Sequence, residues 1–185
     1  LVYHLVVIYW LGANIGAPSR FIALLSMLGS ILVLSFNTVL ISSIWYFIKQ
    51  RLPKYQFTII PIIWVSIEYV RSYGFLGFPW VSLANSQIDY FYLIQNAELT
   101  GIYGISFWIV MINVLAYQLF YERVRYYTYI FVLIFPFMLG FLILSSINID
   151  ENKEFQASLI QPNINLDDKW NSNLAKKNFD NLIEK

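Results

Sequence analysis

The sequence contains no cysteine and little charge. The absence of cysteine excludes disulfides, zinc–thiolate sites and thiol catalysis within these 185 residues. Charged residues make up only 12% of the chain, against about 25% in an average soluble domain. Because 58% of the residues are hydrophobic and the mean hydropathy is +0.58, the composition excludes a soluble globular protein and a disordered chain. The net charge of +1, without a strong basic cluster, also excludes a basic nucleic-acid-binding protein.

The sequence also lacks the local patterns of several enzyme classes. It contains no Gly-rich nucleotide loop and no cluster of metal ligands. No Ser-His-Asp set can form outside the membrane, because the single histidine, His4, lies in an apolar run, where we interpret it as an interior side chain with a partner. The residues alone therefore predict no catalytic centre, cofactor or metal.

Long hydrophobic runs dominate residues 1–147. A helix needs about 20 apolar residues to cross a bilayer, and several uncharged runs reach that length. We predict four complete spans and part of a fifth, at about 1–11 (partial), 21–48, 56–73, 100–121 and 126–147. The short first run is expected to be the second half of a span, and the chain to be a fragment of a longer protein that lacks both ends.

The charges of the short loops predict the orientation of these spans. The loop 49–54 holds three cations and no acid, and the turn 122–125 holds two arginines. Two spans separate these loops, so both lie on one side, which the positive-inside rule assigns to the cytoplasm. Residues 148–185 are then predicted to be extracytoplasmic.

Residues 148–185 have the composition of a soluble module. The segment 155–161 alternates between apolar and polar residues, which indicates a strand, and 172–185 has the apolar spacing of a helix. One strand and one helix cannot bury a core alone, so this module is predicted to open a larger α/β domain. The predicted fold class is an α-helical membrane bundle, residues 1–147, followed by the first strand and helix of an α/β domain.

Two charged residues lie deep inside a predicted span. Glu68 and Arg71 share one helix face at a spacing of three residues and can pair. Charge within a membrane is costly and faces the bundle interior or water. The pair is either a structural ion pair near the outer interface or a polar lining beneath a substrate cavity.

The glycine- and aromatic-rich segment 74–80 follows directly. Its glycines and Pro79 favour a rigid loop, and Phe78 and Trp80 supply bulky apolar surface. The loop is interpreted either as an interfacial anchor or as a wall of a lipid-binding site. Gly101 and Gly104, which open the next span, are interpreted as allowing close helix packing.

Several short motifs resemble, in order, those of the apolipoprotein N-acyltransferase family. They are E-x-x-R-S at 68–72, GFPW at 77–80, S-Q at 86–87, G-x-Y-G-x-S-F at 101–107, and L-I-Q-P-N-I with a following K-W at 159–170. The resemblance extends over about 9–185. One departure is Pro162, where the family commonly has glycine, which makes the end of the predicted strand stiffer.

The resemblance implies a fold and a location. The family has eight spans, with a nitrilase-like αββα domain between the seventh and the eighth. The present spans then correspond to part of the third and to the fourth to seventh, and 148–185 begin the nitrilase-like domain. The implied location is the bacterial inner membrane, with 148–185 on the periplasmic side, which agrees with the charge bias of the loops.

The resemblance also implies an activity. Members of this family transfer a fatty acyl chain from a membrane phospholipid to the N-terminal cysteine amine of a diacylated lipoprotein. The implied chemistry is a ping-pong transfer through a cysteine thioester, with a glutamate as general base and a lysine at the oxyanion. No residue of this sequence is assigned to that catalytic set, and these 185 residues alone are expected to be inactive. The partners are the phospholipid donor, the lipoprotein acceptor and the membrane.

Candidate contacts with substrate or lipid follow from position and from the resemblance. Trp170 is predicted to touch lipid or acyl chain at the mouth of the cavity, or else to pack its loop onto the domain. The predicted substrate- and lipid-binding residues are Trp170, Trp80, Pro79, Phe78, Arg71 and Glu68. A different interpretation, a non-enzymatic transporter module or scaffold with a short soluble tail, also fits the composition.

Overall fold

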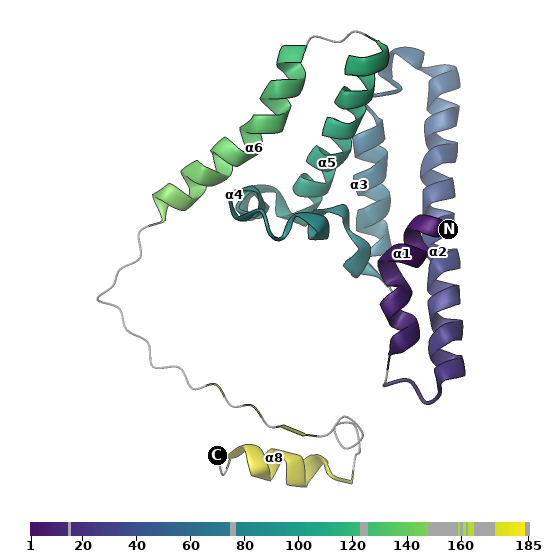
Figure 1. Cartoon of the computed structure of the whole chain (residues 1–185), viewed down its shortest axis with the longest axis vertical. Helices are drawn as coiled ribbons and strands as arrows, with labels where there is room; N and C mark the ends of the chain where they lie inside the picture. The colour runs from purple at the N-terminus through teal and green to yellow at the C-terminus, as the bar shows by residue number, and fades with distance from the viewer. Residues whose placement is uncertain are drawn as a thin grey trace.

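The structure, a computed structural model, describes residues 1–14, 16–74, 77–122, 126–147, 159, 161, 163–164 and 173–183. The helices of the membrane part lie side by side, from α1 and α2 through α3 and α5 to α6 (Figure 1). The described helices are α1 (Val2–Ile8), η1 (Tyr9–Ala13), α2 (Arg20–Arg51), η2 (Pro53–Tyr55), α3 (Ile60–Arg71), η3 (Pro79–Val81), η4 (Leu83–Gln87), α4 (Phe91–Ile94), α5 (Ala97–Tyr121), α6 (Tyr126–Ser146) and α8 (Ala175–Ile183).

Three of the described helices, α2, α5 and α6, are long and apolar enough to cross a membrane. Helix α2 begins where the Ser19 hydroxyl accepts the N–H of Ile22 at 3.3 Å, and it ends before Pro53. Lys49 and Arg51 in its last turn complement the negative end of the helix dipole. The sequence prediction of apolar membrane helices is confirmed for these three.

The predicted span at 56–73 forms a shorter helix than expected. After Pro53 the chain makes a 3₁₀ turn and further turns, and α3 starts only at Ile60, with Pro61 in its first turn. Its 12 residues extend about 18 Å, less than the roughly 30 Å of a bilayer core. Helix α3 therefore cannot cross alone, and it packs between α2 and α5.

The basic loop, residues 49–54, and the aromatic loop, residues 77–87, lie at opposite ends of α3. In Figure 1 the C-terminal ends of α2 and α5 lie together at the upper end, and the loop 77–87 continues from the lower end of α3. The two basic loops, 49–54 and 122–125, therefore follow helices that end on one side of the bundle, as the parity of the spans requires.

A small core joins α1, α2 and the start of the aromatic loop. Its buried members are Ile8, Ile31, Leu34 and Val81, and Phe78 packs against them. Elsewhere the long helices keep large apolar side chains exposed, such as Phe36 at 66% and Phe131 at 64%. Apolar surface of this extent is what a bilayer, rather than water, would surround.

The C-terminal segment is described only in part. Helix α8 occupies Ala175–Ile183, within the predicted helix at 172–185. Most of the predicted strand at 155–161 lies outside the described residues; Leu159 and Gln161, which are described, are not in a strand, nor is any other residue for which the structure gives a conformation. The nitrilase-like α/β domain therefore stays a prediction.

Candidate functional site

The loop 77–87 is held to α3 by its own backbone and by two charged side chains. The N–H of Phe78 donates to the carbonyl of Arg71 at 3.0 Å, which folds the loop back onto the end of the helix. Glu68, only 4% exposed, accepts the N–H of Leu83 at 2.8 Å through Oε1. Arg71 donates from Nη2 to the carbonyl of Val81 at 3.1 Å. The loop is thus fixed at three points along its length.

Glu68 and Arg71 also form an ion pair. The distance from Arg71 Nη2 to Glu68 Oε1 is 3.7 Å, with both side chains largely buried. Glu68 Oε2 and Arg71 Nε are buried without a hydrogen-bond partner. The two residues line a small cavity of about 20 Å³, together with Tyr3 and His4. A polar cavity of this size has room for about one water, and the pair holds the loop through Leu83 and Val81.

Hydroxyl groups on α5 contact the same loop and the end of α3. Ser106 is fully buried; its Oγ lies 3.1 Å from the Oγ of Ser82 and accepts the N–H of Ala84 at 3.1 Å. Tyr103, one turn earlier, places its hydroxyl 2.8 Å from the Oγ of Ser72. No pattern in the sequence predicted a role for Ser106 or Tyr103. The only signal was their place in the G-x-Y-G-x-S-F motif.

The two glycines of that motif act locally. Gly101 has φ = 63°, in the left-handed region, and separates the first turn of α5 from the rest of the helix. The side chain of Thr100 occupies the place where a Cβ of residue 104 would sit. The close approach is therefore at Gly104 alone, to a residue of the same helix, since nothing lies within 4 Å of a Cβ added at Gly101. Close packing between helices at these two glycines stays a prediction.

The aromatic side chains of the loop differ in exposure. Phe78 is half-buried against the core, whereas Trp80 is 66% exposed, and their rings meet edge to face at 5.1 Å. Pro79 begins η3 between them. The Trp80 carbonyl accepts a hydrogen bond from the Nδ2 of Asn85 at 2.9 Å. The loop thus offers one ring to the protein and one to its surroundings.

A groove of about 450 Å³ lies beside Phe78 and Arg71. Residues of α2, three of them small, make up most of its lining, which is Ser26, Gly29, Ser30, Val33, Leu34, Arg71, Gly77 and Phe78. A volume of this size fits small-molecule sites, which span roughly 300–1,000 Å³. Arg71, whose guanidinium is paired with Glu68, is the one charged residue of an otherwise apolar and hydroxyl lining, which suits a chain-like apolar ligand.

The structure brings together five of the six predicted site residues. Arg71 and Phe78 line the groove; Glu68, Pro79 and Trp80 belong to the same helix end and loop but not to the groove lining. Trp170 lies outside the described residues. His4 is 4% exposed, with Nδ1 3.3 Å from the Oγ of Ser35, which confirms its interpretation as an interior side chain with a partner. Within the described ranges no three His, Asp or Glu side chains gather as metal ligands.

The chain is similar to a known protein family and to several of its members. Residues 1–115 match the family model described as the apolipoprotein N-acyltransferase N-terminal domain. The apolipoprotein N-acyltransferase of Geobacter metallireducens is 33% identical over 128 residues, 63% of this chain and 24% of that protein. The protein of the same name from Chlorobaculum tepidum is 26% identical over 143 residues, 73% of this chain and 27% of the relative.

A longer alignment reaches into the C-terminal segment. The apolipoprotein N-acyltransferase 1 of Treponema denticola is 25% identical over 193 aligned residues, which cover 92% of this chain and 35% of that protein. The chain therefore spans about a quarter to a third of the length of these curated relatives. No solved structure matches the chain.

Proposed function

The chain belongs to the apolipoprotein N-acyltransferase family, and from this premise we propose the activity of the complete protein. It transfers a fatty acyl chain from a membrane phospholipid to the N-terminal cysteine amine of a diacylated lipoprotein. The observation that carries the proposal is the family match over residues 1–115, which include every residue of the groove and its loop. This match favours the acyltransferase over a transporter module or scaffold.

The proposed role of the described residues is to hold lipid beside the membrane surface. The groove accepts an acyl chain along the small residues of α2, with Phe78 as a wall. Arg71 hydrogen-bonds the loop through Nη2 and also lines the groove. Glu68 acts indirectly, by holding Leu83 and Arg71 in place. Trp80, exposed on the loop, contacts lipid or acyl chain from outside.

The proposed chemistry needs groups beyond these residues. In the mechanism implied by the family, a cysteine thiolate attacks the phospholipid ester carbonyl, the lysophospholipid leaves as its alcohol, and the amine of the lipoprotein then displaces the thiolate. The present sequence has no cysteine. We therefore expect that a polypeptide of these 185 residues forms no thioester with labelled phospholipid.

The proposed location is the bacterial inner membrane, with several spans and with residues 148–185 on the periplasmic side. The support is the excess of cations in the loop 49–54 and the turn 122–125, and the common side on which α2 and α5 end. The groove beside Phe78 then faces the outer leaflet, the same side as the soluble module.

The function is tested in the complete protein with purified diacylated lipoprotein and labelled phospholipid. We expect triacylated product by mass spectrometry, and a several-fold lower rate for Phe78→Ala. Phe120→Ala is the matched control, because Phe120 is 80% exposed near the C-terminal end of α5 and lines no described site. A complete protein that binds phospholipid but yields no triacylated lipoprotein contradicts the proposed activity. Equal rates for the two variants would show that Phe78 has no part in binding the acyl chain.

Trp170 is tested in the same assay. We expect Trp170→Ala to slow acyl transfer while the thermal unfolding temperature stays unchanged. Unchanged turnover, or a fall in stability equal to the fall in rate, would assign Trp170 to packing of its loop.

A further inference from the structure

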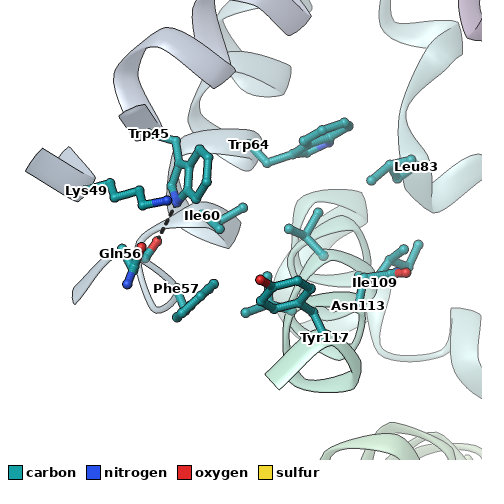
Figure 2. A pocket seen from close by; sticks show the side chains of 12 residues that line it. Trp45, Lys49, Gln56, Phe57, Ile60, Trp64, Leu83, Ile109, Asn113 and Tyr117 are labelled. Carbon is teal, nitrogen blue, oxygen red and sulfur yellow. Dashed lines mark hydrogen bonds between the residues drawn. The ribbon is translucent and has the colours of Figure 1, made fainter. Parts of the chain in front are cut away.

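A second, larger pocket lies between α2, α3 and α5, away from the groove beside Phe78. Its volume is about 510 Å³, and it extends from Lys49 and Gln56 at the basic end of the bundle to Leu83 of η4 (Figure 2). Aromatic and aliphatic side chains dominate its walls, among them Trp64 on α3 and Ile109 on α5 (Figure 2), and Val114 of α5 also lines it. No residue of this pocket was singled out by the sequence motifs.

Lys49 and Gln56 give the basic end of the pocket its polar groups. Lys49 Nζ lies 5.2 Å from the centre of the Trp45 ring, in a cation–π contact. The Trp45 ring is itself fixed, because its Nε1 donates to the carbonyl of Gln56 at 3.0 Å (Figure 2). Lys49 is therefore a positioned cation at the mouth of an apolar space.

No carboxylate neutralises this cation within the described part of the chain, where the ion pair of Glu68 and Arg71 is the one salt bridge found. Arg51 and Lys54 add two more positive charges within five residues, each over an aromatic ring of its own, and the loop holds no acid. The end of the pocket thus carries a positive field next to an apolar interior. The complementary ligand has an anionic head and an apolar tail.

We propose that this pocket binds a phospholipid of net negative charge, with an acyl chain between Trp64 and Val114 and its phosphate at Lys49. The proposal rests on the placement of α2 and α5 in a bilayer and not on acyl transfer. The site takes no part in the proposed transfer. Its basic end, at Lys49 and Gln56, lies before the start of α3, whereas Phe78 follows the end of α3; its other end reaches Leu83 of η4. The lipid stays whole there and braces α2, α3 and α5 against one another, since α3 is too short to span the bilayer alone.

The test uses the complete protein in nanodiscs of phosphatidylcholine that contain a small fraction of phosphatidylglycerol with a diazirine in one acyl chain. After illumination and digestion, we expect cross-linked peptides from the pocket, centred on Trp64 and 109–114. Lys49→Gln should lower this cross-linking on the order of five-fold, the effect of losing one lysine near an anionic headgroup. Lys54→Gln is the matched control, because it removes the same charge from the same loop without touching the pocket.

A second probe distinguishes binding of the anionic headgroup from binding of the acyl chain alone. The same diazirine chain on phosphatidylcholine should cross-link the pocket less than the phosphatidylglycerol probe, and Val114→Trp, which fills the space, should abolish cross-linking by both. Equal labelling by the two probes, or equal loss in Lys49→Gln and Lys54→Gln, overturns the proposed anionic lipid.

A pocket that lipid cannot reach would give a distinct result. If the wild-type pocket is not labelled by either probe, another segment of the complete protein covers it and the proposal is wrong. Acyl transfer measured on the same samples stays near wild type in Lys49→Gln. The lipid site and the proposed enzymatic function can therefore fail independently of each other.

Discussion

The indole Nε1 of Trp108 on α5 donates a hydrogen bond of 2.6 Å to the carbonyl oxygen of Val132 on α6. Pro136 lies four residues after Val132, inside α6, and has no N–H to give to that carbonyl. Asn96 bonds the same region, since its Nδ2 donates to the Pro136 carbonyl at 2.8 Å. In a bilayer core no water replaces a lost backbone bond, so the side chain of Trp108 on the neighbouring helix supplies it.

Trp108→Phe should therefore destabilise the packing of α5 on α6. The substitution keeps an aromatic ring but leaves the Val132 carbonyl without a donor, which costs about 1–3 kcal/mol for a buried group. The measurement is the unfolding free energy of the complete protein in a denaturing detergent.

The control for this prediction is Pro136→Ala, which restores an N–H at position 136. In that background the same Trp108→Phe change should cost much less, so the double-mutant cycle yields a coupling energy of the size of the lost bond. Equal costs in both backgrounds would show that Trp108 stabilises through its ring alone.

The helical part of this fold was largely predictable, because uncharged runs long enough to span a bilayer are visible in composition alone. Helices α2, α5 and α6 lie where those runs lie. The shortness of α3 was not predictable in the same way, because the apolar composition continues from 56 to 73 while the backbone turns until Ile60.

The hydrogen-bond partners of the candidate site residues could be found only from the three-dimensional structure. The spacing of Glu68 and Arg71 predicted that they pair, and they do. Their bonds to Leu83 and Val81 depend on how a loop ten to fifteen residues away folds back, which no local pattern encodes. The contact of Trp108 with Val132 likewise depends on the register of two helices. The lipid-binding roles of these site residues stay predictions.

Gly140 of α6 should tolerate no larger side chain. The carbonyl oxygen of Tyr92 lies where a Cβ of residue 140 would sit, so α4 and α6 meet backbone to backbone. Gly140→Val forces the two apart, and overpacking of this kind costs about 1–3 kcal/mol. Unfolding in detergent measures the change.

The matched control for Gly140 is Gly29→Ala in α2, where nothing lies within 4 Å of the added Cβ. Alanine at a helix interior stabilises by about 0.5–1 kcal/mol relative to glycine. A loss of stability from Gly29→Ala equal to that from Gly140→Val would contradict the close contact with Tyr92.

Glu68→Leu should release the aromatic loop, because the N–H of Leu83 loses its acceptor and Arg71 loses its counter-charge. We expect faster amide hydrogen exchange across 77–87, with protection in α6 unchanged. Glu68→Gln keeps an acceptor oxygen for Leu83 and should raise exchange far less. If both variants exchange alike, the ion pair rather than the hydrogen bond to Leu83 holds the loop.

The predicted orientation places residue 51 in the cytoplasm and residue 152 in the periplasm. Arg51→Cys and Asn152→Cys, each made in the complete protein, present a thiol in a segment that has no cysteine of its own. In intact cells, a membrane-impermeant maleimide should label residue 152 at once and residue 51 only after the membrane is opened. The physical reason is the retention of cationic loops such as 49–54 on the cytoplasmic side. The reverse pattern would turn the bundle over, and would move the groove beside Phe78 to the inner leaflet and the pocket at Lys49 to the outer one.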